Sequence, residues 1–152
     1  MKKLWALSGR IAFWCTWPAL WLYLRSSTRT RVIVHAEGKI LVHKKWLGNG
    51  GWALPGGGLH GGEDSRLGAV RETYEEAGIQ LDPKQLVSHG NHTYHGKGFR
   101  FRYDLYSIEL PKQLPTRNQR LEILQTAWLA PSELTERTTT KEVLGDLKVW
   151  RP

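Results

Sequence analysis

Cysteine is almost absent from this sequence, which has a single one, Cys15, among 152 residues. One cysteine cannot form an intrachain disulfide, so the sequence excludes the class of small domains that disulfide frameworks hold together. A chain of this length is instead long enough to form one domain with its own hydrophobic core. We expect a reducing compartment, with the cytoplasm as the default.

Acidic residues are also in short supply. The 14 Asp and Glu residues are outnumbered by 22 Lys and Arg residues, which gives a formal net charge of +8 and a pI of about 9.8. A positive surface favours anionic partners, such as phosphate esters, nucleic acids or anionic lipids. No specific nucleic-acid site is evident, and composition does not specify an oligomeric state. Internal repeats are lacking as well, which excludes repeat arrays.

The chain lacks an uninterrupted apolar run of the roughly 20 residues that a membrane-spanning helix needs. Its longest candidate, Ile11–Leu24, is nearly all apolar but shorter, and Pro18 would kink a helix there. Three tryptophans at helical spacing share one stripe of this segment: Trp14, Trp17 and Trp21. Tryptophan favours the membrane–water boundary, and the arginines that follow favour anionic headgroups.

Three interpretations of the Trp-rich N-terminal segment, residues 1–28, stay open. Residues 4–25 could attach the protein to a membrane surface, the segment could pack as a helix on its own domain or on a partner, or it could be a secretion signal. We therefore treat residues 1–28 as a hydrophobic segment that is either an anchor or a packed helix. Residues 29–152 then form the main domain.

The most informative stretch runs from Gly57 to Ile79 (GGLHGGEDSRLGAVRETYEEAGI). A glycine-rich loop leads into a predicted helix, which Asp64 or Ser65 can cap at its start. Gly78 suits the left-handed conformation that often follows the end of a helix. Apolar residues at helical spacing predict the face toward the core: Leu67, Val70, Tyr74 and Ala77.

Three glutamates of this helix, Glu72, Glu75 and Glu76, are predicted to share one stripe away from the apolar face. Like charges at this spacing repel one another by about 0.2–0.5 kcal/mol per pair. A hard divalent cation prefers such a cluster of oxygens and would relieve the repulsion. Taken alone, the glutamates are also compatible with an exposed acidic helix face.

Strands are predicted on both sides of this helix. Before it, β-branched or short apolar runs occupy residues 31–35, 39–44 and 52–54; after it, alternating or apolar runs occupy residues 86–94, 99–110 and 123–129. Short helices are expected from Pro131 and over residues 140–147. Strands before and after a helix, with a second helix behind, indicate an α/β or α+β sandwich.

The acidic helix and its loop together carry one fixed pattern: Gly57-x5-Glu63-x7-Arg71-Glu72-x2-Glu75-Glu76-x-Gly78. This pattern resembles the signature of the Nudix hydrolase family (MutT-like). Thr73 stands where that family usually has a larger aliphatic residue. The resemblance implies a mixed β-sheet sandwiched between helices, and metal-dependent hydrolysis of a diphosphate bond in a nucleoside diphosphate linked to another moiety. Two alternatives are a membrane-associated enzyme on a lipid-linked diphosphate and a non-catalytic module that binds a nucleotide or RNA.

The resemblance also implies roles for the charged residues of the pattern. Glu72, Glu75 and Glu76 would bind Mg²⁺ or Mn²⁺ or deprotonate a water molecule. Arg71 and Glu63 would support them, because an arginine can hold a carboxylate with two hydrogen bonds and fix its orientation. The alternative for each side chain is a plain surface ion pair.

Two further metal ligands are candidates outside these side chains. The backbone carbonyl of Gly56 is one, since glycine lets the chain approach an ion closely. MutT-like enzymes also place an acid in a loop shortly before a strand that contains tryptophan, and Glu122 precedes Trp128 by six residues. An ordinary solvated loop acid is an equally good interpretation of Glu122.

The substrate is not specified by any motif that we recognise. Candidates to stack on a nucleotide base are Trp46, Trp52 and Tyr94, although aromatic side chains belong more often to the core. Lys44 and Lys45 are candidates to bind the phosphates of a small nucleotide-type substrate.

Overall fold

The structure is a computed structural model that describes residue 15 and residues 28–46, 50–96, 99–118 and 122–150. The membrane-surface interpretation of residues 4–25 therefore concerns a segment that lies outside the described residues, Cys15 excepted. Among the residues that are described, none of the helices combines the length and the apolar character that a membrane crossing requires.

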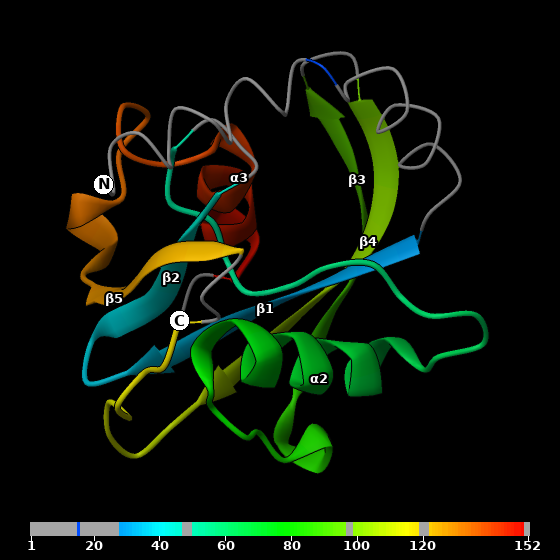
Figure 1. The fold of residues 1–152 in the computed structure, drawn as a ribbon, viewed down its shortest axis with the longest axis horizontal. Coiled ribbons are helices and arrows are strands. Elements are labelled where there is room, and N and C mark those ends of the chain that lie inside the picture. Colours follow the sequence, from blue (N-terminus) through cyan, green and yellow to red (C-terminus); the bar gives the residue numbers. More distant parts are fainter. Residues whose placement is uncertain (1–14, 16–27, 47–49, 97–98, 119–121, 151–152) are drawn as a thin grey trace.

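A five-stranded mixed sheet forms the centre of the domain, with the strand order β3-β4-β1-β2-β5 (Figure 1). Its strands are β1 (Thr28–Ala36), β2 (Lys39–Lys45), β3 (Val87–Gly96), β4 (Phe99–Glu109) and β5 (Ile123–Leu129). β1 runs parallel to β4, and the other neighbouring strands are antiparallel. The mixed sheet predicted from the sequence is thus confirmed.

The segment that connects β2 to α2 contains the glycine-rich loop, and in space it lies between β1 and β2. The two strands pair with each other only beside their turn, at His35–Ile40 and Ala36–Lys39. Farther from the turn the loop takes up the backbone groups of both strands, as in the hydrogen bond from Thr30 N to the Gly57 oxygen (2.9 Å). The predicted strand at residues 52–54 is therefore only a pair of isolated bridges within this inserted loop.

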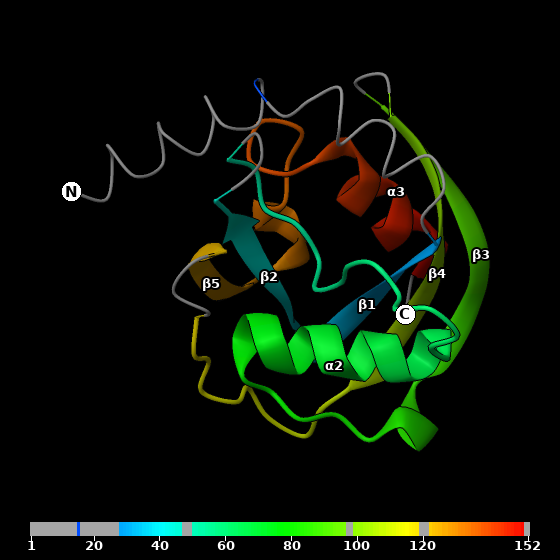
Figure 2. The ribbon, with the colours of Figure 1, turned by 45° about the vertical axis from the view of Figure 1, so that its right-hand side comes forward.

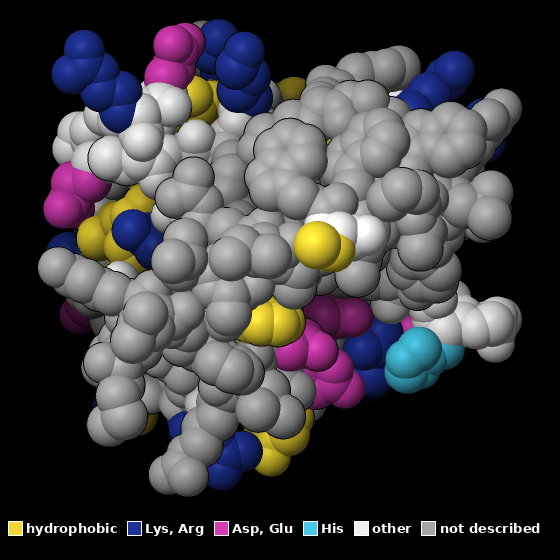
Figure 3. Space-filling view, turned by 45° about the horizontal axis from the view of Figure 1, so that its top comes forward, with side chains coloured by type: hydrophobic (Ala, Val, Ile, Leu, Met, Phe, Trp, Pro, Cys, Tyr) yellow, Lys and Arg dark blue, Asp and Glu magenta, His cyan; other side chains and the backbone are white. Residues whose placement is uncertain are grey.

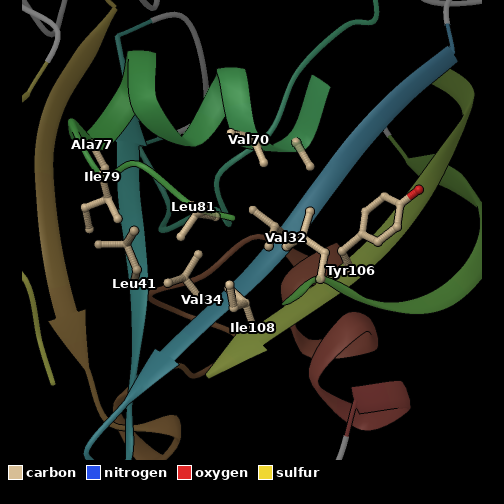
Figure 4. Packing of buried hydrophobic residues seen from close by; sticks show 11 residues of the cluster. Val32, Val34, Leu41, Val70, Ala77, Ile79, Leu81, Tyr106 and Ile108 are labelled. Atoms are coloured by element: carbon tan, nitrogen blue, oxygen red, sulfur yellow. The ribbon is translucent and has the colours of Figure 1, made fainter. Parts of the chain in front are cut away.

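Two helices cover opposite faces of the sheet: α2 (Ser65–Ala77) and α3 (Lys141–Trp150), as Figures 1 and 2 show. Short 3₁₀ turns at η1 (Pro83–Gln85) and η2 (Pro131–Glu133) complete the connections. Successive residues of a strand point to opposite faces. Val32 and Val34 pack in the cluster with α2, which includes Val70 (Figure 4). Ile33 packs in the cluster with α3, which includes Val143. The sandwich of a sheet between helices is confirmed.

Both ends of α2 follow the sequence prediction. The side chain of Asp64 caps its start by accepting hydrogen bonds from the backbone N–H groups of Arg66 and Leu67. Gly78 ends it with φ 72° and donates its N–H to the Tyr74 oxygen. Local interactions at Asp64 and Gly78 therefore set the first and last residues of α2.

The buried face of α2 differs from the prediction. Val70 and Ala77 are buried as expected, but Leu67 is 54% and Tyr74 is 48% exposed. The polar residues that replace them are Thr73 and Glu76. Thr73 satisfies its hydroxyl by donating to the Ala69 oxygen within the same helix (2.8 Å). The periodicity of apolar residues failed here because the helix buries polar side chains that find partners.

Candidate active site

Two glycines bring the loop into direct contact with β1 and α2. Gly56 has φ 147°, and a side chain at this position would overlap with the carbonyl oxygen of Thr30. A side chain at Gly57 would overlap with the carboxylate of Glu72. The loop therefore needs glycine at both positions, and it holds the backbone of Gly56 and Gly57 against the acidic helix.

Glu76 lies at the centre of the site, with only 1% of its surface exposed. Its Oε2 atom accepts a hydrogen bond from the backbone N–H of Gly56 (2.9 Å), and its Oε1 atom lies 2.7 Å from Nζ of Lys45. Lys45 Nζ also donates to the carbonyl oxygen of Gly56 (2.9 Å). The prediction that all three glutamates point away from the core is thus wrong for Glu76, which is buried because it has these partners.

His43 is completely buried beside this ion pair, with Nδ1 3.5 Å from Oε2 of Glu76. Burial, followed by the positive charge of Lys45, holds the pKa of His43 well below its usual value, so the imidazole is neutral. Within the described residues neither ring nitrogen has a hydrogen-bond partner, and the same holds for the buried hydroxyls of Thr30 and Thr126. Lys45, and not His43, therefore provides the positive charge that Glu76 needs.

Glu72 lies one turn before Glu76 and against Gly57. Burial, followed by the negative charge of Glu76, raises the pKa of Glu72. One of its oxygens accepts a hydrogen bond from Nη1 of Arg71 (3.0 Å). The two carboxylates thus lie at consecutive loop residues, and the charge of Glu76 disfavours the charge of Glu72.

Arg71 connects the loop acid with the helix acids. It donates from Nε and Nη2 to the two oxygens of Glu63 (2.8 and 2.9 Å) and from Nη2 to the Gly58 oxygen (3.0 Å). The hydrogen bond to Arg71 is the main reason that the pKa of Glu63 falls to about 2. The structure therefore brings Arg71 and Glu63 together in the forked arrangement that the sequence led us to expect.

Glu75 is the most exposed of the three helix glutamates, and one of its oxygens lies 3.3 Å from Nη1 of Arg71. Figure 3 shows acidic, basic and histidine side chains gathered on one face of the molecule. In the described ranges, no three side chains of His, Cys, Asp or Glu lie close enough together to hold a metal ion. The candidate ligand oxygens belong to Glu76 and the Gly56 carbonyl, which both contact Lys45, and to Glu72, whose carboxylate lies against Gly57.

These oxygens fit a hard divalent cation. Carboxylate and carbonyl oxygens are the ligands that Mg²⁺ and Mn²⁺ prefer. Two of them, from Glu76 and Gly56, already bind a positive charge in this structure, the ammonium group of Lys45. The position thus attracts a cation, and its donor set suits the metal that the sequence pattern implies.

Of the two lysines expected to bind phosphate, the structure brings only Lys45 to the acids. Lys44 points to the opposite face of the sheet, where its Nζ lies 4.5 Å from the centre of the Trp52 ring. Trp52 itself is buried in the cluster with α3. This placement argues against the expected contacts of Trp52 with a base and of Lys44 with phosphates near Glu76.

The remaining candidates are spread over two regions. Tyr94 packs against the cluster with α3, 4.7 Å from the Phe101 ring, and burial together with a hydrogen bond to Glu142 raises its pKa. Trp46 is partly buried and donates its backbone N–H to the oxygen of Glu122 (2.7 Å). The exposed Glu122 therefore lies opposite Trp46 just beyond the end of β2, and the following residue, Ile123, pairs with Lys45.

His43 is the residue of this site that the sequence did not indicate. The sequence has six histidines, and no motif surrounds His43 in its strand. The available signal was its position two residues before Lys45, which places both side chains on the same face of β2.

Comparison with known proteins agrees with this geometry. A family model described as NUDIX domain matches residues 26–149. The chain is 30% identical over 113 residues to the phosphatase NudJ of Escherichia coli (strain K12), which covers 74% of this chain and 73% of that protein.

Solved structures share the fold. A MutT NUDIX hydrolase from Burkholderia pseudomallei has a TM-score of 0.69 and 20% identity, covering 80% of this chain and 95% of that chain. The NUDIX domain of Shewanella oneidensis NrtR, complexed with ADP ribose, has a TM-score of 0.72 and 12% identity, covering 82% of this chain and 86% of that chain. At these identities the likeness concerns the fold alone.

Proposed function

Because the chain belongs to the Nudix family and is a hydrolase acting on phosphoric anhydride bonds, we propose that it hydrolyses the diphosphate bond of a nucleoside diphosphate linked to another moiety, with Mg²⁺ or Mn²⁺ as cofactor. One observation carries this proposal. The carboxylate of Glu76 and the carbonyl of Gly56 bind one cationic group, the ammonium of Lys45, and the carboxylate of Glu72 lies against the neighbouring Gly57.

The proposed roles follow from the positions of these groups. Glu72, Glu76 and the Gly56 carbonyl hold the metal, and Glu75 lies beside them on the exposed side of the helix, in contact with Arg71. When bound, a divalent ion neutralises phosphate oxygens and makes a water molecule more acidic. The three glutamates share the functions of metal ligand and proton acceptor.

Arg71 and Glu63 act on the orientation of these acids. The fork between them fixes the guanidinium, whose Nη1 then holds Glu72 through one hydrogen bond (3.0 Å). Glu122 stands near the end of β2 and is the candidate for a further ligand.

Two observations support a nucleotide-type substrate. The net charge of +8 favours an anionic ligand. Structural neighbours include a domain complexed with ADP ribose and a C. elegans Ap4A hydrolase, the latter with a TM-score of 0.67. ADP ribose is a diphosphate compound that carries a nucleoside, and the second protein is named for Ap4A, a dinucleoside polyphosphate.

A phosphate-release screen tests the proposal directly. The full chain is incubated with nucleotide sugars, dinucleotides and nucleoside triphosphates, in the presence of Mg²⁺, Mn²⁺ or EDTA. We expect metal-dependent release of phosphate or a nucleotide from at least one diphosphate compound, and loss of that release in Glu76→Gln. Hydrolysis that persists in EDTA, or that Glu76→Gln retains in full, would contradict the proposed site.

A further inference from the structure

The ammonium group of Lys45 occupies the place that the proposed function reserves for a metal ion. It lies 2.7 Å from Oε1 of Glu76 and 2.9 Å from the carbonyl oxygen of Gly56. Both oxygens belong to the proposed ligand set. A cation bound by both oxygens would need the space that the ammonium group now fills.

The fold holds both oxygens in place around this ammonium group. Gly56 packs directly against Thr30. Its φ of 147° and the carbonyl oxygen of Thr30 leave no room for a side chain at this position. Glu76 is buried and accepts the Gly56 N–H as well. Removing the cation from a buried carboxylate is strongly destabilising, so the site needs a positive charge, either from Lys45 or from a metal ion.

Lys45 is suited to supply that charge and to give it up. Its side chain remains about one-third exposed (32%), in contrast to the buried Glu76. A lysine has a flexible stem of four carbons and a single point charge, so it can leave without disturbing the backbone. The neighbouring Lys44 cannot substitute for it, because Lys44 lies over the Trp52 ring on the other face of the sheet.

We propose that Lys45 is a resident counter-cation of the metal site: its ammonium group neutralises Glu76 in the absence of metal and is displaced when a divalent ion binds. This inference rests on the proposed function, since it takes Glu76 and Gly56 as metal ligands. The displaced ammonium group stays next to the site and is then available to an anionic substrate. Metal binding and the release of Lys45 are one competitive equilibrium.

Metal affinity of the full chain is the first test, with Mn²⁺ alone as the probe in calorimetry or electron paramagnetic resonance. If Lys45 occupies the site in at least about nine molecules out of ten, the apparent dissociation constant is about tenfold higher than the intrinsic one. We therefore expect Lys45→Met to bind Mn²⁺ about tenfold more tightly. Measurement at 0.15 M salt, where the screening length is about 8 Å, limits long-range effects of the lost charge.

Lys44→Met is the matched control, because it removes the same charge from the adjacent residue. We expect its Mn²⁺ affinity to stay within about twofold of the wild type at this ionic strength. Equal tightening in both variants, or none in Lys45→Met, would overturn the displacement. If no variant and no wild type bound Mn²⁺, the proposed metal dependence itself would fail, which is a different result.

Stability and spectroscopy provide readouts that do not depend on activity. In EDTA, Lys45→Met should melt at a lower temperature than the wild type, and Mn²⁺ should raise its Tm by more. In the wild type, Mg²⁺ should shift the ¹⁵N signal of the Lys45 ammonium group toward that of a solvated lysine. An unchanged ammonium signal at saturating Mg²⁺ would overturn the proposal, and this measurement holds even if Lys45→Met does not fold.

Discussion

Arg71 binds Glu63 through two parallel hydrogen bonds, from Nε to Oε1 (2.8 Å) and from Nη2 to Oε2 (2.9 Å). The pair joins the glycine-rich loop to α2 eight residues farther along the chain. A third contact, from Nη1 to Glu72 (3.0 Å), extends the pair to the buried acids. The orientation of Glu72 thus depends on a fork that only a planar guanidinium can form.

Arg71→Lys should lower kcat/KM on the best substrate by about 10–100-fold, the usual cost of losing a group that orients a ligand. An ammonium group cannot bind Glu63 with two bonds and still reach Glu72. Arg66→Lys is the matched control, since Arg66 is on the same helix and donates to the Pro83 and Leu86 oxygens instead. Steady-state kinetics compare the two, and wild-type rates in Arg71→Lys would reduce Arg71 to a surface charge.

Glu72→Gln and Glu76→Gln should each lower activity by at least about a hundredfold, because each removes a charge that the metal or the transferred proton needs. Glu72→Gln should keep the fold, since burial and Glu76 already disfavour the charge of Glu72. Glu136→Gln, at an exposed turn position, is the control and should remain active. Kinetics with circular dichroism decide the matter: full activity in both site variants contradicts the assignment.

Stability at low pH should depend on Glu63. Its pKa is 4.5 in the reference state and about 2 in the fold, chiefly because Arg71 donates to it. A carboxyl whose pKa is lower in the folded state stabilises the fold above its unfolded pKa, and this contribution disappears as the pH falls through the folded value. We therefore expect the free energy of unfolding to fall between about pH 4.5 and pH 2.

Urea unfolding at several pH values measures this effect, with Glu63→Gln as the comparison. The variant cannot titrate at this position, so its stability should decline less steeply over the same interval than that of the wild type. Parallel curves for the two proteins would show that the ion pair contributes nothing to the acid sensitivity.

Tyr103→Phe should destabilise the contact between the sheet and α3. The Tyr103 hydroxyl donates to Oδ1 of the buried Asp146 (2.6 Å), whose other oxygen lies 3.1 Å from Nη1 of Arg31. Hydrogen bonds to a charged group contribute about 1.5–3 kcal/mol, against about 0.5–1.5 kcal/mol for neutral pairs. We expect a loss of free energy of unfolding in the first range, measured by urea denaturation.

Tyr106→Phe is the control for this variant. It lies in the same strand and donates to the neutral hydroxyl of Ser65 at a longer distance (3.2 Å). Its cost should fall in the lower range of about 0.5–1.5 kcal/mol. Equal losses in the two variants would mean that the charge of Asp146 has no bearing on the strength of the hydrogen bond.

The sequence by itself determined the family and the local structure of the site. The spacing of the residues from Gly57 to Gly78 was enough to identify the resemblance, because the specified residue types are needed within one loop and one helix. Asp64 caps the helix and Gly78 adopts the left-handed conformation, as predicted from propensities that act within a few residues. Runs of strand and helix periodicity predicted a sandwich of strands and helices, and the resemblance added that its sheet is mixed.

Only the tertiary structure decided which charged groups are buried and which lysine meets them. Apolar periodicity placed Leu67 and Tyr74 in the core, yet Glu76 is buried while those two are exposed. The reason is that burial of a carboxylate depends on a cation from another element, and periodicity along one helix carries no information about it. The register of β2 against the inserted loop brings Lys45 to Glu76 and sends Lys44 to Trp52, a choice of strand face that becomes definite only when the sheet assembles.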